Sequence, residues 1–141
     1  MKKIALLIVA MIALSSASAQ ITQISSSKLP GQARTTISKA WNKAPIVDAW
    51  RNKMGKRIEY KASVEDGSTI KFNSAGSWIE VRSFNGIPLS LLPANIPAYI
   101  DKYYEGQMIV WASRNTRRYQ IQLANGTKLE FNSKGVFQAF L

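Results

Sequence analysis

Two stretches of the chain repeat each other without a gap: Tyr60–Trp78 reads YKASVEDGSTIKFNSAGSW, and Tyr119–Phe137 reads YQIQLANGTKLEFNSKGVF. Each begins with tyrosine, carries Asp-Gly or Asn-Gly at the same point and continues to Phe-Asn-Ser, a glycine and an aromatic residue. The separation is 59 residues throughout (119 − 60 and 137 − 78). Self-similarity at a fixed period predicts two copies of one structural unit.

Apolar and polar residues alternate at the start of each stretch, over Tyr60–Val64 and Tyr119–Leu123. A period of two with one apolar face predicts a half-buried β-strand. Asp66-Gly67 and Asn125-Gly126 follow these strands. Such pairs are preferred in two-residue type I′ turns because both central residues need positive φ. Each stretch is therefore predicted to fold back on itself as a hairpin.

The same alternation extends each hairpin to a four-stranded antiparallel meander. Leu29-Pro30 and Leu92-Pro93 lie upstream at a separation of 63 residues (92 − 29), so the first copy is four residues longer between helix and hairpin (63 − 59). We expect the extra residues in a longer turn around Arg51–Lys56. The predicted strands are Ile46–Trp50, Tyr60–Val64, Ile70–Phe72 and Trp78–Arg82, then Ile109–Ser113, Tyr119–Leu123, Leu129–Phe131 and Phe137–Leu141.

A short helix is predicted before each meander. Pro30 and Pro97 lie where a helix can begin, because the first turn leaves its N–H groups without intrahelical partners. Apolar residues then recur at i, i+4 and i+8, which places them on one helix face. They are Ala33, Ile37 and Trp41 in the first copy and Ile96, Ile100 and Tyr104 in the second.

The sequence thus predicts an α+β fold of two tandem helix-plus-four-stranded antiparallel meander repeats, joined into one curved sheet with the helices on one face. A unit of about 60 residues has a marginal core alone, which favours joining the sheets edge to edge. The expected segments are a flexible N-terminal arm over residues 20–28, the first repeat over 29–86 and the second over 87–141.

The first 19 residues have the features of an export signal. Lys2 and Lys3 precede an apolar run over Ile4–Leu14, and small residues end at Ala17-Ser18-Ala19. The run of 11 residues (14 − 4 + 1) is shorter than the about 20 that a membrane-spanning helix needs. We expect cleavage after Ala19 and a periplasmic or secreted protein. No cysteine follows the cleavage point, so the sequence does not predict a lipoprotein.

The chain contains neither cysteine nor histidine. A disulfide framework, a thiolate nucleophile and the commonest general base and metal ligand are thereby excluded. The eight carboxylates of the chain suggest no catalytic pair by their spacing. The sequence therefore predicts no enzymatic activity, no cofactor and no metal site.

The charge is strongly basic. Beyond residue 19 the chain has 17 Lys and Arg (19 less Lys2 and Lys3) against 8 Asp and Glu, or about +9. Such a charge indicates an anionic partner, but the export signal argues against nucleic acid as the physiological one. Anionic lipid, an acidic glycan, an acidic protein, or a merely solvated basic surface all remain open, as does the oligomeric state.

A candidate partner-binding face follows from the strand alternation. If Tyr60 and Val64 face the helices, the polar residues between them face the open side of the sheet, where they are either solvated or available to a partner. The pattern does not decide which way Trp50 and Trp111 point. The residues predicted on the candidate face are Lys61, Lys71, Trp78, Arg118, Gln120, Gln122 and Glu130.

The whole pattern resembles the PepSY-like, beta-lactamase-inhibitor-like proteins, which are small exported proteins of Gram-negative bacteria of the Bacteroidetes type. The resemblance rests on the doubled order of Leu-Pro, apolar helix, Tyr-led strand, Asp/Asn-Gly, apolar-x-Phe-Asn and Gly-x-aromatic, with Ile87-Pro88 between the copies, and it covers Lys28–Leu141. It implies two αβ units that form one long curved sheet with helices on the convex side. In the similar inhibitor fold, the concave face clamps a protruding segment of a target enzyme.

The resemblance and the residues together predict an exported, non-enzymatic binding protein. The first hypothesis is a protein-binding or inhibitor-like module that uses the open face of the sheet. The alternatives are a basic envelope-associated protein that binds anionic lipid or glycan through charge, and a structural envelope protein. The net charge of about +9 departs from the more acidic strands typical of the family.

Overall fold

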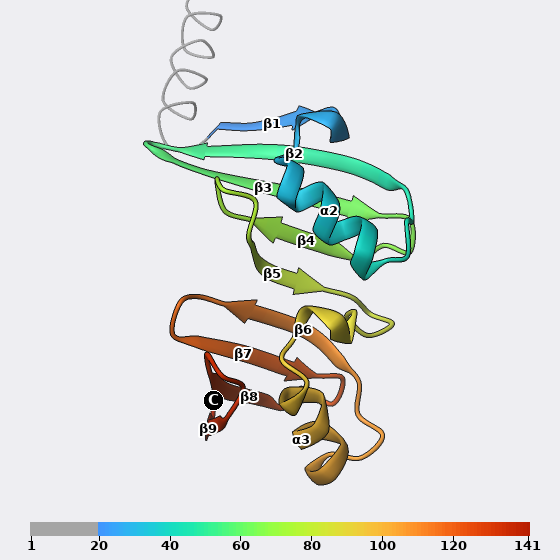
Figure 1. The fold of residues 1–141 in the computed structure, drawn as a ribbon, viewed down its shortest axis with the longest axis vertical. Coiled ribbons are helices and arrows are strands. Elements are labelled where there is room, and N and C mark those ends of the chain that lie inside the picture. The colour runs from blue at the N-terminus through green and yellow to red at the C-terminus, as the bar shows by residue number, and fades with distance from the viewer. Residues whose placement is uncertain (1–19) are drawn as a thin grey trace, which may run out of the picture.

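A computed structural model of the protein describes residues 20–141. The predicted export signal, residues 1–19, lies outside the described residues. Within the described part, two α-helices and eight of the nine strands follow the order predicted from the sequence, and all nine strands form one antiparallel sheet in chain order (Figure 1). The predicted α+β class and single antiparallel sheet are therefore confirmed.

Each α-helix precedes four strands, and each pair of adjacent strands forms an antiparallel ladder. The helices are α2 (Gly31–Ala40) and α3 (Asn95–Tyr103), with two short 3₁₀ turns, η1 (Ser26–Lys28) and η2 (Leu89–Leu91). The strands are β1 (Gln20–Ile24), β2 (Ile46–Met54), β3 (Arg57–Val64), β4 (Thr69–Phe72), β5 (Trp78–Arg82), β6 (Ile109–Arg114), β7 (Arg118–Leu123), β8 (Lys128–Asn132) and β9 (Phe137–Phe140).

Both helices lie on the same face of the sheet (Figure 1). Ala33 and Ile37 of α2 and Ile96 and Ile100 of α3 are buried, as their spacing predicts. Trp41 and Tyr104 end the helices as C-caps and pack against the core at its margin. Within residues 20–141, neither helix is long and apolar enough to cross a membrane.

The core is a row of apolar side chains that crosses the sheet beneath the helices. The strand register places these residues directly opposite one another from strand to strand, and every interior member is buried. Each fully buried Ile, Val or Leu contributes about 1.5–3 kcal/mol relative to exposure. The row runs Ile24, Ala49, Ala62, Ile70, Val81, Ala112, Ile121, Leu129 and Phe140.

The predicted type I′ turns are wrong. Val64 N–H donates to Ser68 O and Gly67 N–H to Val64 O, which makes a three-residue loop in which only Gly67 has positive φ (87°). This is a type I turn closed by a glycine in the left-handed region. The Asp66 carboxylate accepts from Ser68 N–H at 2.8 Å, a local bond that stabilises this turn. The loop ending at Gly126 has the same bonds.

The N-terminal arm is also not loose as predicted. Gln20–Ile24 pairs with β2 as the edge strand β1, because it satisfies the backbone groups along the outer edge of β2. The predicted longer turn around Arg51–Lys56 is not formed by the four extra residues of the first half either. Instead they lengthen the β2–β3 hairpin, in which Met54 pairs with Arg57 across a two-residue turn containing Gly55.

The start of α2 packs directly on the turn between β4 and β5. A Cβ added at Gly76 would lie 2.9 Å from Pro30 Cβ, which is closer than real Cβ atoms approach, and 3.2 Å from Ala33 N, which is a tight contact. At Gly67, which has nearly the same φ, an added Cβ would meet nothing within 4 Å. The two glycines thus share one backbone constraint and differ in packing.

We expect Gly67→Ala to lower the free energy of unfolding by about 1–2 kcal/mol, the cost of a left-handed alanine. Gly76→Ala should cost about 1–3 kcal/mol more, because the helix start must also move. Urea denaturation of both variants at one temperature measures the difference. Equal losses would show that the turn and α2 are not in contact.

Candidate binding face on the open side of the sheet

The face of the sheet away from α2 and α3, called here the open face, carries a second unbroken row of residues. It alternates with the core row along every strand and therefore points to the opposite side. Most of its members are polar and half-buried by their neighbours. The row runs Gln23, Trp50, Lys61, Lys71, Glu80, Ser113, Gln120, Glu130 and Ala139.

A parallel row lies two residues further along the strands on the same face. The register pairs Asp48 with Ser63, Ser63 with Thr69 and Thr69 with Arg82, and then continues across the β5–β6 pair. Its remaining members are Trp111, Gln122 and Lys128. The predicted residues Lys61, Lys71, Gln120, Gln122 and Glu130 therefore all lie on the open face.

Both tryptophans that the sequence left undecided lie on this face. Trp50 neighbours Lys61, whose ammonium nitrogen lies 5.7 Å from the centroid of the indole ring. The ammonium nitrogen of Lys128 lies 5.8 Å from the centroid of the Trp111 ring, although Lys128 is on β8, one strand beyond the residue opposite Trp111. Both distances fall within the range of cation–π attraction. The open face thus carries two tryptophan–lysine pairs, one in each half of the sheet.

The carboxylates of the open face already have partners. Glu80 lies 3.6 Å from Lys71 and 4.0 Å from Arg82, and it accepts a hydrogen bond from Trp111 Nε1 at 3.2 Å. Glu130 pairs with Arg118 at 3.0 Å, so this predicted arginine reaches the face as well. Lys61 and Lys128 form no ion pair within residues 20–141, and neither does Asp48, which accepts a hydrogen bond from Gln23. Both of these lysines lie beside the tryptophans.

A hollow of about 270 Å³ opens next to Trp50 at the β1 side of the open face. Ile21 of β1 is 69% exposed and forms an apolar wall with Trp50. The side-chain oxygen of Asn52 is buried there and has no hydrogen-bond partner within the described residues. The hollow combines an aromatic surface with polar groups, and its other lining residues are Glu59, Tyr60, Lys61 and Lys71.

Trp78 does not lie on the open face, and this part of the prediction is wrong. Its side chain is only 4% exposed and packs on the helix side, with its ring centroid 6.3 Å from that of Tyr119. A β-bulge between β4 and β5 places Trp78 opposite the buried Phe72, which turns it inward. The Arg114 guanidinium covers the ring at 4.3 Å and donates to the Trp78 carbonyl. In the sequence, Trp78 occupies the same repeat position as Phe137, which also packs against the core. This match between two aromatic residues is the sequence signal for an inward position.

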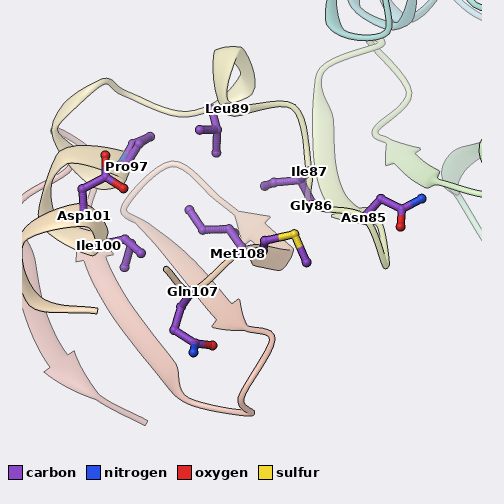
Figure 2. A pocket seen from close by; sticks show the side chains of 10 residues that line it. Asn85, Gly86, Ile87, Leu89, Pro97, Ile100, Asp101, Gln107 and Met108 are labelled. Carbon is purple, nitrogen blue, oxygen red and sulfur yellow. The ribbon is translucent and has the colours of Figure 1, made fainter. Parts of the chain in front are cut away.

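A second hollow, of about 260 Å³, lies on the helix side between α3 and the segment that links β5 to β6 (Figure 2). Figure 2 shows Ile100 of α3 and Met108 beside the same space, with Asp101 at its margin. Asp101 is the only ionisable residue in its lining. This hollow holds none of the predicted site residues, and within residues 20–141 no three Asp or Glu gather in a possible metal site.

Two helices on one face of an open nine-stranded antiparallel sheet define an α+β module whose other face is accessible. The chain belongs to the PepSY-like family, since residues 58–139 match the family described as "Putative beta-lactamase-inhibitor-like, PepSY-like". The resemblance seen in the sequence is thereby confirmed. This description names no catalytic activity. No match was found among curated proteins.

Three crystal structures of Bacteroides proteins have a similar fold. A "putative calcium-regulated periplasmic protein" from Bacteroides thetaiotaomicron is 21% identical, with a TM-score of 0.80 over 86% of this chain and 96% of that one. A "putative periplasmic protein" from Bacteroides vulgatus is 20% identical, with a TM-score of 0.78 over 86% and 97%. A second Bacteroides vulgatus protein, described as a "putative periplasmic protein of unknown function", is 28% identical, with a TM-score of 0.78 over 88% and 99%.

The opposite locations of Trp78 and Trp50 predict different effects on stability. Trp78→Ala should lower the free energy of unfolding by about 3–5 kcal/mol because it opens a cavity in the core. Trp50→Ala should lower it by about 1 kcal/mol or less, since the ring lies on the open face. Urea denaturation checks both values. A larger loss for Trp50→Ala than for Trp78→Ala would reverse the assignment of the two faces.

Proposed function

We propose that the protein is an exported, non-enzymatic module that binds another exported or envelope protein on the open face of its sheet. The observation that carries this proposal is the pair of lysine-flanked tryptophans, Trp50 and Trp111, on one uncovered face. Tryptophan and arginine are enriched among the residues that dominate protein–protein binding energy. Arg82 and Arg118 lie on the same face and add to this composition.

The dimensions of the face suit a protein partner. Trp50 and Trp111 lie on β2 and β6, four strands apart, which corresponds to about 19 Å at the usual spacing of about 4.8 Å between strands. A standard interface buries about 800 Å² on each partner and spans a comparable distance. Two aromatic anchors at this separation can therefore belong to one interface, with the polar residues between them as its hydrogen-bonding part.

The charges next to Trp50 favour an acidic group on the partner. Lys61 and Lys71 lie directly opposite each other on β3 and β4, and like charges in this position destabilise a sheet. Of these two lysines, only Lys71 has a carboxylate partner, Glu80. A carboxylate of the partner placed beside Lys61 would relieve the repulsion, and the adjacent indole ring would shield the new ion pair from water. The hollow next to Trp50 is the place for this contact.

An inhibitor-like role is the specific form of this proposal, in which the open face holds a protruding segment of an exported enzyme. It is supported by the family description and by the accessible face itself. We further infer that the two halves are tandem copies, since the same loop chemistry recurs at Gly67 and Gly126. The periplasmic neighbours and the predicted signal cleaved after Ala19 support export.

The open face can be tested by matched charge reversal. One variant carries Lys61→Glu, Lys71→Glu and Arg118→Glu; the control carries Arg34→Glu, Lys39→Glu and Lys43→Glu on the helix side, where all three are exposed. Both change two lysines and one arginine. A partner captured from envelope extract at high salt should lose about 30-fold or more in affinity for the first variant, equivalent to about 2 kcal/mol, and little for the control.

Retention of the partner by the open-face variant would contradict the proposal, as would equal loss in both. If the captured partner is an enzyme, its activity in the presence of the wild-type protein and of each variant tests inhibition directly. Inhibition that disappears only with the open-face variant would establish the inhibitor-like role. Full activity in the bound complex would reduce the proposal to binding alone.

The basic segment of residues 28–57 favours a second candidate function, the binding of anionic lipid or glycan through charge. Residues 28–57 contain eight Lys and Arg, all exposed, and a single carboxylate, Asp48, which lies on the open face. Among the eight, only Arg57 forms an ion pair within the described residues, with Glu59. This part of the surface is therefore almost uniformly positive. The eight are Lys28, Arg34, Lys39, Lys43, Arg51, Lys53, Lys56 and Arg57.

Charge-based binding should depend on salt and on the number of charges rather than on their position. Vesicles with anionic lipid should bind the wild-type protein at low ionic strength and release it as the Debye length shrinks to about 8 Å near 0.15 M salt. The two triple variants should then lose binding to a similar degree. Vesicle co-sedimentation over a salt series measures this, and salt-independent binding would exclude the charge mechanism.

A further inference from the structure

The outer edge of β9 carries a group of exposed apolar side chains. Phe140 is 66% exposed, although the register places it in the core row opposite Leu129. Val136 and Leu141 flank the strand and are exposed as well, and Tyr103 at the end of α3 is exposed nearby. These residues need an explanation because contiguous apolar surface is usually covered by a partner.

A continuous run of aromatic rings connects α3 with this edge. The ring centroids of Tyr103 and Tyr99 lie 4.6 Å apart. Tyr99 stacks on Phe137 with a centroid distance of 4.9 Å and an interplanar angle of 11°. The ring centroids of Phe137 and Phe140 lie 5.5 Å apart. Burial raises the pKa of Tyr99 above its ordinary value of 10.0, with a further contribution from Tyr104 and Tyr103, so this ring stays uncharged. Apolar side chains that contact the core therefore extend to the outer edge of β9, where a sheet edge would usually carry polar residues.

Strand β5 in the first half of the sheet corresponds to β9 and shows how the same residue position is buried when the strand is paired on both edges. At the repeat separation of 59 residues, the residue that corresponds to Phe140 is Val81 on β5. Val81 is fully buried because β6 pairs with β5 and places Ala112 opposite it. β9 therefore has the side-chain pattern of an interior strand, yet within residues 20–141 no strand pairs with its outer edge.

Natural edge strands are usually protected by charged residues or proline, which prevent unwanted pairing. Residues 136–141, VFQAFL, contain neither. Instead, the side-chain amide of Gln138 donates to the carbonyls of Val136 and Phe137 at 3.2 and 3.1 Å. These are local bonds that a pairing strand can replace. The edge is therefore competent to accept another strand.

We propose that the occupant is a second copy of this chain, whose β9 pairs antiparallel with the first to make one sheet across both copies. A two-fold axis at the centre of β9 places Phe140 opposite Phe137 of the second copy, and Leu141 opposite its Val136. The strand is self-complementary in this register because it carries a phenylalanine at each end. The pairing is closed, since each copy offers the same edge once. The open face remains free for the function proposed above.

Sedimentation velocity of the full-length exported protein tests the proposal over about 1 µM to 1 mM, the range of weak association. The wild-type protein should form a dimer at the upper end. Phe140→Lys should raise the dimer dissociation constant at least tenfold, since it puts a charge into the pairing edge. The matched control is Phe84→Lys, because Phe84 is 87% exposed in the link between β5 and β6, away from β9, and should leave the constant unchanged.

Hydrogen exchange of the backbone amides gives a second readout that does not depend on a variant. Residues 136–141 should become protected as concentration rises, whereas β1 at the other edge should not. A wild-type protein that stays monomeric throughout overturns the proposal, as does a dimer weakened by Phe84→Lys and not by Phe140→Lys. Protection of both edges would indicate head-to-tail β9–β1 pairing instead. Protection of β9 only in envelope extract would assign the edge to a different protein.

Discussion

The pairing of β5 with β6 is the interaction on which the rest of the structure depends. It joins Val81 to Ala112 in the centre of the core row and so connects the part of the sheet under α2 with the part under α3. Without it, each half would have about 60 residues and a marginal core. With it, both halves share one buried layer, and both rows of the open face continue from the first half of the sheet into the second.

The open face is a consequence of the same pairing. Because side chains alternate along a strand, every residue placed inward by the core row leaves its neighbours outward. Local ion pairs neutralise two carboxylates of this face: Glu80 pairs with Lys71, and Glu130 pairs with Arg118. Lys61 and Lys128 lie beside the tryptophans instead. The tryptophans and the lysines beside them are the features on which the proposed binding of an acidic protein rests.

Much of the fold could be predicted from short-range patterns. Strand alternation located Trp78–Arg82 to the residue, and helical spacing located the buried Ile37 and Ile100. The failures have physical causes. Type I′ turns were expected from Asp-Gly and Asn-Gly pairs, but a side-chain bond from Ser68 N–H to Asp66 favours a different loop. The β1 strand was missed because a short polar segment pairs only when β2 offers it an edge.

The sequence by itself determined the absence of thiol and imidazole side chains and the positions of both helices and most strands, since these follow from composition and local periodicity. It also placed Lys61, Lys71, Gln120, Gln122 and Glu130 correctly on the open face. Only the tertiary structure decided the directions of Trp50, Trp78 and Trp111 and the exposure of Phe140. Those depend on bulges, on register and on which edge finds a partner, because each is set by contacts between residues far apart in the chain.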